Sequence, residues 1–328
     1  MHNSDARIIK RIKAVLDVKG KAYKEQLEKS KEDFYEYCMP GSVNNWQHPQ
    51  KPPTQASLAL VANEINPERI LDFGTGLTAY TFLKHTKSSV LSIDNSFVWL
   101  LRLRTWLKNK NLSTSGLTFF ESADQGHVYN LENDIHPATK SVGMSGFLYH
   151  TPLNLDKETF SWDSMIYEEP SHIQSITNWK SVYSDSQWAE MPEREKLDQC
   201  RTARFLGYVR DNGVYCLDAS GYDSKSISEI GKFSFIQFDF GHMWSRLAYL
   251  QCAISMLDRS KPSVINIDDL HKKDVFFDNK TYLDMATDAI SSAGGVWLHC
   301  EDATTDFQGG YSDFAYFPSR RKEKKGTE

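Results

Sequence analysis

The sequence predicts a doubly wound α/β fold, in which helices cover both faces of a mostly parallel sheet. Two observations predict it. Short runs of apolar and β-branched residues alternate with helical patterns over residues 69–122 and again over residues 232–317. A glycine-rich turn directly follows the first of these runs. Strands and helices that alternate at this length favour a parallel sheet, because each crossover helix must cover one face.

The chain is expected to divide into an extension, a core, an insertion and a tail. The extension, a helical segment and loop, is 1–56; the Rossmann-like core is 57–122 and 231–318; the inserted cap is 123–230; the basic tail is 319–328. With 328 residues the chain exceeds a typical single domain, so a core with a large insertion fits its length. The hydrophobic content of 40% is enough for a sizeable core.

The N-terminal segment 6–37 is highly charged and predicts one helix or a pair of helices, with Gly20 as the break. An apolar stripe at helical spacing runs along it, formed by Ile8, Ile12, Val15 and Leu16. Such a stripe is expected to dock on the parent domain or on a partner subunit. Further along the chain, Thr54 is expected to cap a helix over 55–65.

The core is expected to contain seven strands, which lie at 70–73, 90–94, 117–120, 235–239, 263–269, 296–300 and 313–317. Helices are expected from the glycine turn through Lys84 and over 98–108, 244–257 and 281–292. The last strand could pair antiparallel with its neighbour. A second candidate for the third strand lies at 214–217. We favour 117–120, because its connection to the second strand has an ordinary length.

Residues 123–230 interrupt this alternation. They are rich in aromatic side chains, namely Phe147, Tyr149, Phe160, Trp162, Tyr167, Trp179, Tyr183 and Trp188. A helix is expected near the end of the insertion, over 193–211. The aromatic side chains fit two interpretations, a lid that folds over a substrate and a small core of the insertion itself.

The composition argues against several classes of protein. A formal net charge of −5 disfavours a general nucleic-acid binder whose affinity comes from phosphate neutralisation. No apolar run approaches the roughly 20 residues that span a bilayer, and the N-terminus lacks the basic-then-apolar order of a signal peptide. Five scattered cysteines without a Cys-x-x-Cys pair favour neither zinc nor a disulfide framework. We therefore expect a cytoplasmic protein.

A nucleotide-like ligand is expected where the first strand turns into a helix, at Asp72-Phe73-Gly74-Thr75-Gly76. Glycines there let the backbone turn sharply and approach a ligand closely. The third glycine of the dinucleotide fingerprint is absent, which disfavours NAD and FAD. Asp94, followed by Asn95, ends the second strand, where an acid can accept both ribose hydroxyls. The alternative is a plain glycine turn with an exposed acid at a strand end.

Acidic residues follow the fourth and fifth strands. Asp239 precedes His242 by three residues, and Asp268 and Asp269 close the next strand. Because neighbouring parallel strands end at one edge of the sheet, these carboxylates are expected to converge, and hard oxygen ligands suit Mg²⁺ or another divalent cation. His242 could then act as a general base. The alternatives are a helix cap at Asp239, a structural histidine, and a loop turn at Asp268-Asp269; His271 is a weaker second base.

With these motifs the chain resembles the class I S-adenosylmethionine-dependent methyltransferases, and most closely the metal-dependent O-methyltransferases of the macrocin and catechol types. Leu71–Gly76 is similar to the family's first motif, and Asp94 to its ribose-binding acid. Asp239–Trp244 is similar to the segment Asp-Gly-x-His-x-Tyr. The resemblance implies one cofactor set, Asp72, Gly74, Thr75, Gly76, Asp94 and Asn95. It also implies three metal ligands, Asp239, Asp268 and Asp269, and the base His242.

The sequence departs from this family in places. Trp244 replaces the motif's tyrosine, Phe240 replaces a small residue, and Lys261-Pro262-Ser263 replaces a glycine pair. The function implied is metal-assisted O-methylation of a small-molecule or sugar hydroxyl, by a chain that could form a homo-oligomer. Two alternatives stay open: N-methylation of a nucleic acid or protein, and a non-catalytic binding module that keeps the fold.

Overall fold

The computed structural model describes most of the predicted core and the N-terminal helices. The longer described ranges are 3–38, 50–74, 76–93, 232–239, 243–273, 279–306 and 309–320. The shorter ones are 103, 106–107, 109–112, 117–118, 185–190, 214–218 and 221–225. The predicted helices over 98–108 and 193–211, the basic tail and most of the insertion therefore lie wholly or largely outside the described residues.

Helices and strands alternate through the core, as predicted. The helices are α1 Asn3–Val15, α2 Lys21–Tyr37, α3 Pro52–Ile65, α4 Leu77–His85, α8 Asp185–Glu190, α11 Met243–Ser255, α12 Tyr282–Ser292 and α13 Glu301–Thr304. The strands are β1 Arg69–Phe73, β2 Ser89–Ile93, β3 Leu117–Thr118, β4 Val214–Asp218, β5 Gly221–Lys225, β6 Phe235–Phe238, β7 Ser263–Ile267, β8 Val296–Trp297 and β9 Asp313–Phe317.

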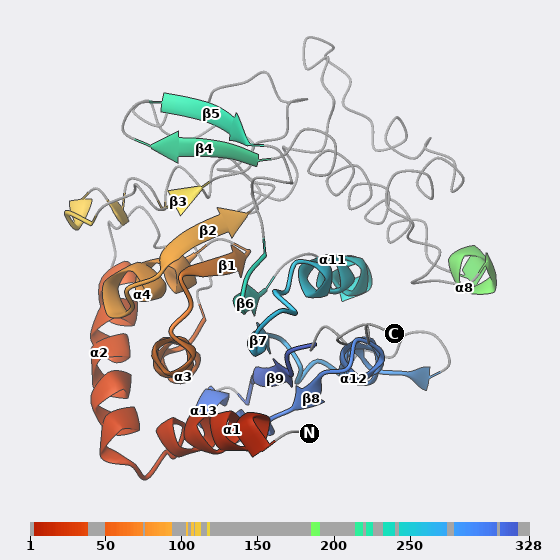
Figure 1. The fold of residues 1–328 in the computed structure, drawn as a ribbon. Coiled ribbons are helices and arrows are strands. Elements are labelled where there is room, and N and C mark those ends of the chain that lie inside the picture. The colour runs from red at the N-terminus through yellow and green to blue at the C-terminus, as the bar shows by residue number, and fades with distance from the viewer. Residues whose placement is uncertain are drawn as a thin grey trace, which may run out of the picture.

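The strands form one sheet in the order β5-β4-β3-β2-β1-β6-β7-β9-β8 (Figure 1). Its centre, from β3 to β7, is parallel. The final strand β9 inserts antiparallel between β7 and β8, which confirms the predicted antiparallel pairing. The chain order reverses at β1, whose neighbours are β2 and β6. In open α/β sheets, ligands bind beyond the carboxyl ends of the strands at such a reversal.

Helices cover both faces of the sheet, as a doubly wound fold requires. Alternate residues of a strand point to opposite faces, and neighbouring residues of β1 accordingly join different clusters. Ile70 packs in a core cluster with Leu58 of α3 and Phe82 of α4. Leu71 packs in a second cluster, with Leu250 of α11 and Ile290 of α12. The centre of the sheet around β1, β6 and β7 is thus buried on both sides.

The sheet has nine described strands, two more than predicted. Both candidates for the third strand belong to it: Leu117–Thr118 lies parallel beside β2, as favoured, and Val214–Asp218 pairs antiparallel with the outer side of β3. The hairpin β4–β5 adds the two further strands. The predicted strand 296–300 stops at Trp297, because His299 adopts a left-handed backbone with φ of 55° and α13 begins at Glu301.

The N-terminal extension is a helix pair that docks on the core, as the apolar stripe predicted. Gly20 separates α1 from α2. Ile12 and Leu16 are buried in the same cluster as α3 and α4. The predicted cap at Thr54 is wrong, because α3 already begins at Pro52. The Thr54 hydroxyl instead donates a hydrogen bond to the carbonyl of Thr304, and so ties α3 to α13.

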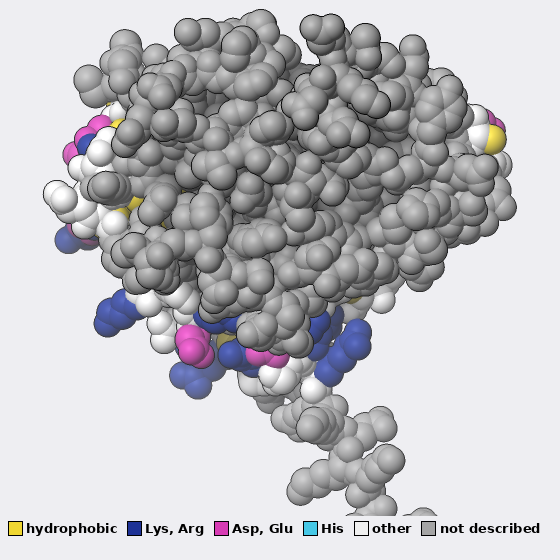
Figure 2. All heavy atoms as spheres, turned by 90° about the horizontal axis from the view of Figure 1, so that it is seen from above, with side chains coloured by type: hydrophobic (Ala, Val, Ile, Leu, Met, Phe, Trp, Pro, Cys, Tyr) yellow, Lys and Arg dark blue, Asp and Glu magenta, His cyan; other side chains and the backbone are white. Residues whose placement is uncertain are grey.

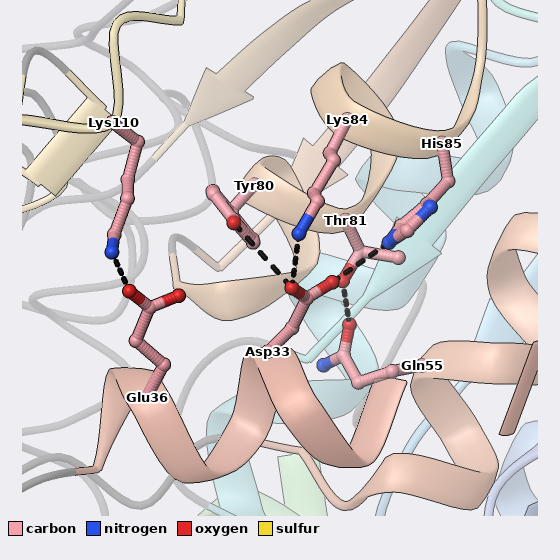
Figure 3. A network of polar contacts seen from close by, with 8 residues as sticks. All are labelled: Asp33, Glu36, Gln55, Tyr80, Thr81, Lys84, His85 and Lys110. Carbon is pink, nitrogen blue, oxygen red and sulfur yellow. Dashed lines mark hydrogen bonds and ion pairs between the residues drawn. The ribbon is translucent and has the colours of Figure 1, made fainter. Parts of the chain in front are cut away.

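A polar network fastens α2 to α4 (Figure 3). The carboxylate of Asp33, a residue only 3% exposed, accepts bonds from Lys84 and from the Tyr80 hydroxyl, and its second oxygen lies 2.7 Å from Nε2 of His85. Burial works to raise the pKa of Asp33, but the bonds from His85 and Lys84 outweigh it, so the pKa is lowered. The ionised carboxylate is therefore the form that the fold stabilises.

Replacing Asp33 by Asn should destabilise the protein by about 2–3 kcal/mol at pH 7, because Lys84 and His85 lose the charge of a nearly buried carboxylate that they contact. Since the folded-state pKa of Asp33 is lowered, its contribution is present above the unfolded pKa of about 4 and lost as the pH falls through the folded value. Urea unfolding of both proteins at pH 7 and pH 3 measures this difference. An equal difference at both pH values would contradict the assignment.

None of the described helices is long and apolar enough to cross a membrane.

Viewed from above, the described side chains along the lower edge include Lys and Arg beside Asp and Glu (Figure 2). Both signs of charge thus occur side by side there, in keeping with the mild net charge of −5.

Candidate active site

The glycine turn and the acidic residues meet at one edge of the sheet, as predicted. The amide of Asp239 donates to the carbonyl of Phe73, over 2.9 Å, one residue before Gly74. The amide of Asp268 donates to the carbonyl of Phe238, over 3.0 Å. These bonds continue the parallel ladders of β1, β6 and β7 past the strand ends. The glycine turn is therefore the immediate neighbour of the acidic edge.

Gly74 and Gly76 shape the turn between β1 and α4. Gly74 has a φ of 107°, a left-handed conformation that side chains with a Cβ rarely adopt. Gly76 is extended, and a Cβ added to it would meet no described atom within 4 Å. The described backbone thus leaves open space beside Gly76, where a ligand could approach. Thr75, between them, lies outside the described residues.

Asp72 supports this turn from within. Its side chain is fully buried and accepts hydrogen bonds from the Thr78 hydroxyl, over 2.7 Å, and from the Ser92 hydroxyl, over 2.9 Å. These contacts tie the end of β1 to the first turn of α4 and to β2. The structure therefore gives Asp72, predicted as a cofactor-binding residue, the position of a group that holds the turn in shape.

Asp239, Asp268 and Asp269, here called the carboxylate trio, converge at the same edge. One oxygen from each lies within 4.8 Å of the others. The side chain of Asp239 is 33% exposed and that of Asp269 18%, so the trio is reachable from outside. Asp269 has a left-handed backbone with φ of 64°, which ends β7 two residues earlier than predicted. The predicted meeting of the three carboxylates is confirmed.

Two basic residues that the sequence analysis did not single out neutralise part of this charge. Arg246, in α11, places Nη2 3.0 Å from Oδ1 of Asp239 and 2.8 Å from Oδ2 of Asp269. Lys272 places Nζ 2.7 Å from the same oxygen of Asp269. Asp268 makes no ion pair within the part of the chain that the structure describes. For Arg246, the signal in the sequence was that it is the one charged residue of the helix Met243–Ser255.

Burial and mutual repulsion separate the pKa values of the trio. Burial, followed by the charges of Asp239 and Asp269, raises the pKa of Asp268 well above its usual value. Burial also raises the pKa of Asp239, against the opposing charge of Arg246. For Asp269 the effect of burial is outweighed by Arg246 and Lys272, and its pKa is lowered. Carboxylates that resist ionising together are stabilised by an added cation.

Of the two histidines considered as a base, His271 lies among the described residues and His242 does not. His271 follows the trio, and its Nδ1 accepts a hydrogen bond from the amide of Tyr311, over 3.2 Å. This bond joins the loop after β7 to the segment before β9, a structural role in keeping with its low rank as a base. His242, Asp94 and Asn95 lie outside the described residues, so their predicted roles as base and cofactor ligands remain predictions.

A second group of ionisable side chains lies where β9 begins. Oxygen or nitrogen atoms of His299, Glu301 and Asp313 lie within 4.8 Å of one another. Oδ1 of Asp313 accepts hydrogen bonds from the amides of Cys300 and Phe314. Burial nevertheless raises the pKa of Asp313 to about 6, despite the two amide bonds, and Glu301 adds to the rise. The folded protein thus binds a proton at Asp313 more tightly than the unfolded chain does.

Replacing Asp313 by Asn should stabilise the protein at pH 8 by about 1–3 kcal/mol, because the amide oxygen keeps both backbone bonds and no buried charge remains. A raised folded-state pKa gives full stability below the unfolded pKa of about 4 and loses it as the pH rises through about 6. The gain should therefore shrink towards pH 4. Melting temperatures of both proteins across this range test it, and a gain that grows towards acid pH would contradict it.

Comparisons with known proteins give likenesses at the level of the fold. No family model and no curated protein sequence matches the chain. The O-methyltransferase TomG from Streptomyces achromogenes, solved with SAM, is 10% identical, with a TM-score of 0.40 over 90% of both chains. Cofactor-bound Rv0187 from MTB is 12% identical, with a TM-score of 0.41 over 95% of this chain and 97% of that one. The SAH-bound methyltransferase PaMTH1 from Podospora anserina is 10% identical, with a TM-score of 0.36 over 98% of both.

Proposed function

We propose that this protein is an S-adenosylmethionine-dependent methyltransferase that acts on a hydroxyl oxygen with the help of a divalent cation. The observation that carries the proposal is the backbone bond between Asp239 and Phe73, which sets the carboxylate trio beside the glycine turn. A donor bound at the turn and an acceptor held at the trio would then be neighbours. Alignment of two reacting groups in this way is a large part of what such an enzyme must supply.

The glycine turn fits the cofactor. A Cβ added at Gly76 would meet no described atom within 4 Å, which suits a ligand that approaches the backbone closely, and Asp72 keeps the turn in shape through Thr78 and Ser92. Strand β2 lies parallel to β1 and ends level with it, and Asp94 and Asn95 follow β2 in the sequence. We assign to these two residues the ribose hydroxyls of the cofactor.

The carboxylate trio fits a divalent cation. Three hard oxygen donors converge from the ends of two neighbouring strands, which suits Mg²⁺ completed by water and substrate oxygens. Burial, followed by the charges of Asp239 and Asp269, raises the pKa of Asp268, and a bound cation would oppose both effects. When bound, the cofactor would supply an electrophilic methyl group, and the cation would lower the pKa of the acceptor hydroxyl.

The acceptor would lie between the turn and the trio. His242, three residues beyond Asp239, is assigned the removal of the hydroxyl proton. The aromatic side chains of the insertion, between 123 and 230, are assigned the recognition of a small molecule or a sugar, since aromatic faces suit both. In this arrangement Asp72 and the two glycines orient the donor, while Asp239, Asp268 and Asp269 orient the acceptor.

Isothermal titration with S-adenosylmethionine, in the presence and absence of Mg²⁺, tests the proposal. Binding of the cofactor is expected in both conditions, and hydroxyl methylation only when Mg²⁺ is present. Cofactor binding together with methyl-transfer activity that is unchanged by Mg²⁺ and by chelators would favour N-methylation instead. No cofactor binding at all would overturn the proposal in favour of a non-catalytic module.

A further inference from the structure

Arg246 places a positive charge against two members of the carboxylate trio, Asp239 and Asp269. It belongs to the second turn of α11, seven residues after Asp239, and its side chain is only 7% exposed. A single nitrogen, Nη2, contacts oxygens of both Asp239 and Asp269, at 3.0 and 2.8 Å. The guanidinium thereby joins the end of β6 to the end of β7.

The charge of this group is permanent. A guanidinium does not lose its proton in a protein, and although burial works to lower the pKa of Arg246, the charges of Asp269 and Asp239 outweigh it and the pKa is raised. By contrast, Lys272 contacts the same oxygen of Asp269 with 38% of its own side chain exposed, where water weakens the attraction. Arg246 is therefore the stronger of the two internal counter-charges.

A divalent ion would use carboxylate oxygens that Arg246 already contacts. The ion and the guanidinium would then contact the same carboxylates, and two positive charges at such short range repel. At the same time, without an ion, Arg246 offsets the negative charges of two of the three carboxylates, Asp239 and Asp269. The two cations thus serve the same carboxylates and oppose each other.

We propose that Arg246 is an internal competitor of the divalent cation: it holds the trio together in the metal-free protein and lowers the affinity of the trio for metal. This inference rests on the proposed metal site. It makes metal binding a substitution of one cation by another, in which the guanidinium gives up at least one carboxylate. Arg246 is accordingly a positioning residue, which acts through Asp239 and Asp269.

The test uses the full chain with Mn²⁺ as the probe. Arg246→Met keeps the length of the side chain and removes its charge. In a calorimetric titration after treatment with a chelator, this variant should bind Mn²⁺ about tenfold more tightly than the wild type. Its metal-free melting temperature should fall, and saturating Mn²⁺ should raise that temperature by more than it does in the wild type.

Two variants make the comparison specific. Arg259→Met removes the same charge near the opposite end of β7, where Arg259 contacts the Phe317 ring and the Ala293 carbonyl, so its Mn²⁺ affinity should equal that of the wild type. Lys272→Met removes the exposed partner of Asp269 and should tighten binding only about two- to threefold. If Arg246→Met does not fold, the other two variants decide. A higher Mn²⁺ affinity of Lys272→Met, with an unchanged affinity of Arg259→Met, supports the competition. Equal Mn²⁺ affinities of these two variants overturn it.

Unchanged or weaker Mn²⁺ binding by folded Arg246→Met would overturn the inference. Absence of Mn²⁺ binding in every variant would overturn it as well, together with the metal part of the proposed function. Titration of the same preparations with S-adenosylmethionine separates the two claims. If Arg246→Met binds Mn²⁺ more tightly but does not bind S-adenosylmethionine, the competition is supported and the proposed methyltransferase function is contradicted.

Discussion

Asp239→Asn should lower the rate of methyl transfer by roughly 10²–10³-fold, because polarisation by a cation is worth several kcal/mol and the variant loses one charged ligand. The affinity for Mn²⁺ should fall with it. Asn preserves the shape of the side chain and the backbone bond to Phe73, so the edge of the sheet stays in place. Turnover at saturating cofactor, measured with increasing Mg²⁺, is the appropriate readout.

A matched variant separates the loss of a ligand from the loss of a charge. Asp258→Asn removes the same charge before β7, where the carboxylate bonds Ser260 and Lys261 near the surface. Its turnover should equal that of the wild type. If Asp239→Asn kept full turnover and the same Mg²⁺ dependence, the carboxylate trio would have no part in the reaction.

His242→Ala should reduce turnover by about 10²–10⁴-fold, the range that a positioned general base contributes. The affinity for S-adenosylmethionine should not change, because the histidine is assigned to the acceptor and not to the cofactor. The rate of the wild type should rise with pH through the pKa of the base, and the rate of the variant should lose that dependence. Single-turnover kinetics across pH 5 to 9 measure both.

His271→Ala is the control for this assignment. His271 follows Asp269 by two residues, and its ring accepts a hydrogen bond from the Tyr311 amide. Its replacement should cost some stability and leave turnover within about threefold, as expected for a residue outside the site. The reverse pattern, with His271→Ala inactive and His242→Ala active, would assign the base to His271.

Much of the fold is predictable because strands buried on both faces have a plain signature. The runs at 70–73, 90–94 and 235–239 are mostly apolar, and the strands β1, β2 and β6 of the parallel centre fall on them. Strand ends are less predictable. Asp269 and His299 adopt left-handed backbones that end β7 and β8 early, and a local sequence pattern does not encode this preference for residues other than glycine.

The candidate site was only half predictable, for a similar reason. The carboxylate trio follows from the topology, since acids after adjacent parallel strands must end at one edge. The role of Arg246 depends on where α11 lies relative to Asp269. That residue is 23 positions further along the chain and follows β7, so the contact is set by the tertiary fold. Thr54 shows the opposite case: a good capping residue by composition, it is used to bind α13 because α3 starts two residues earlier.

The central claim is that a methyl donor at the Gly74–Gly76 turn and a cation at Asp239 and Asp268 are neighbours. Nuclear magnetic resonance of S-adenosylmethionine labelled with ¹³C in its methyl group measures this directly, because paramagnetic broadening by Mn²⁺ falls steeply with distance. The methyl signal of the bound cofactor should vanish when Mn²⁺ is added to the wild type and persist in Asp239→Asn. A bound methyl signal that stays sharp in the wild type at saturating Mn²⁺ would contradict the account.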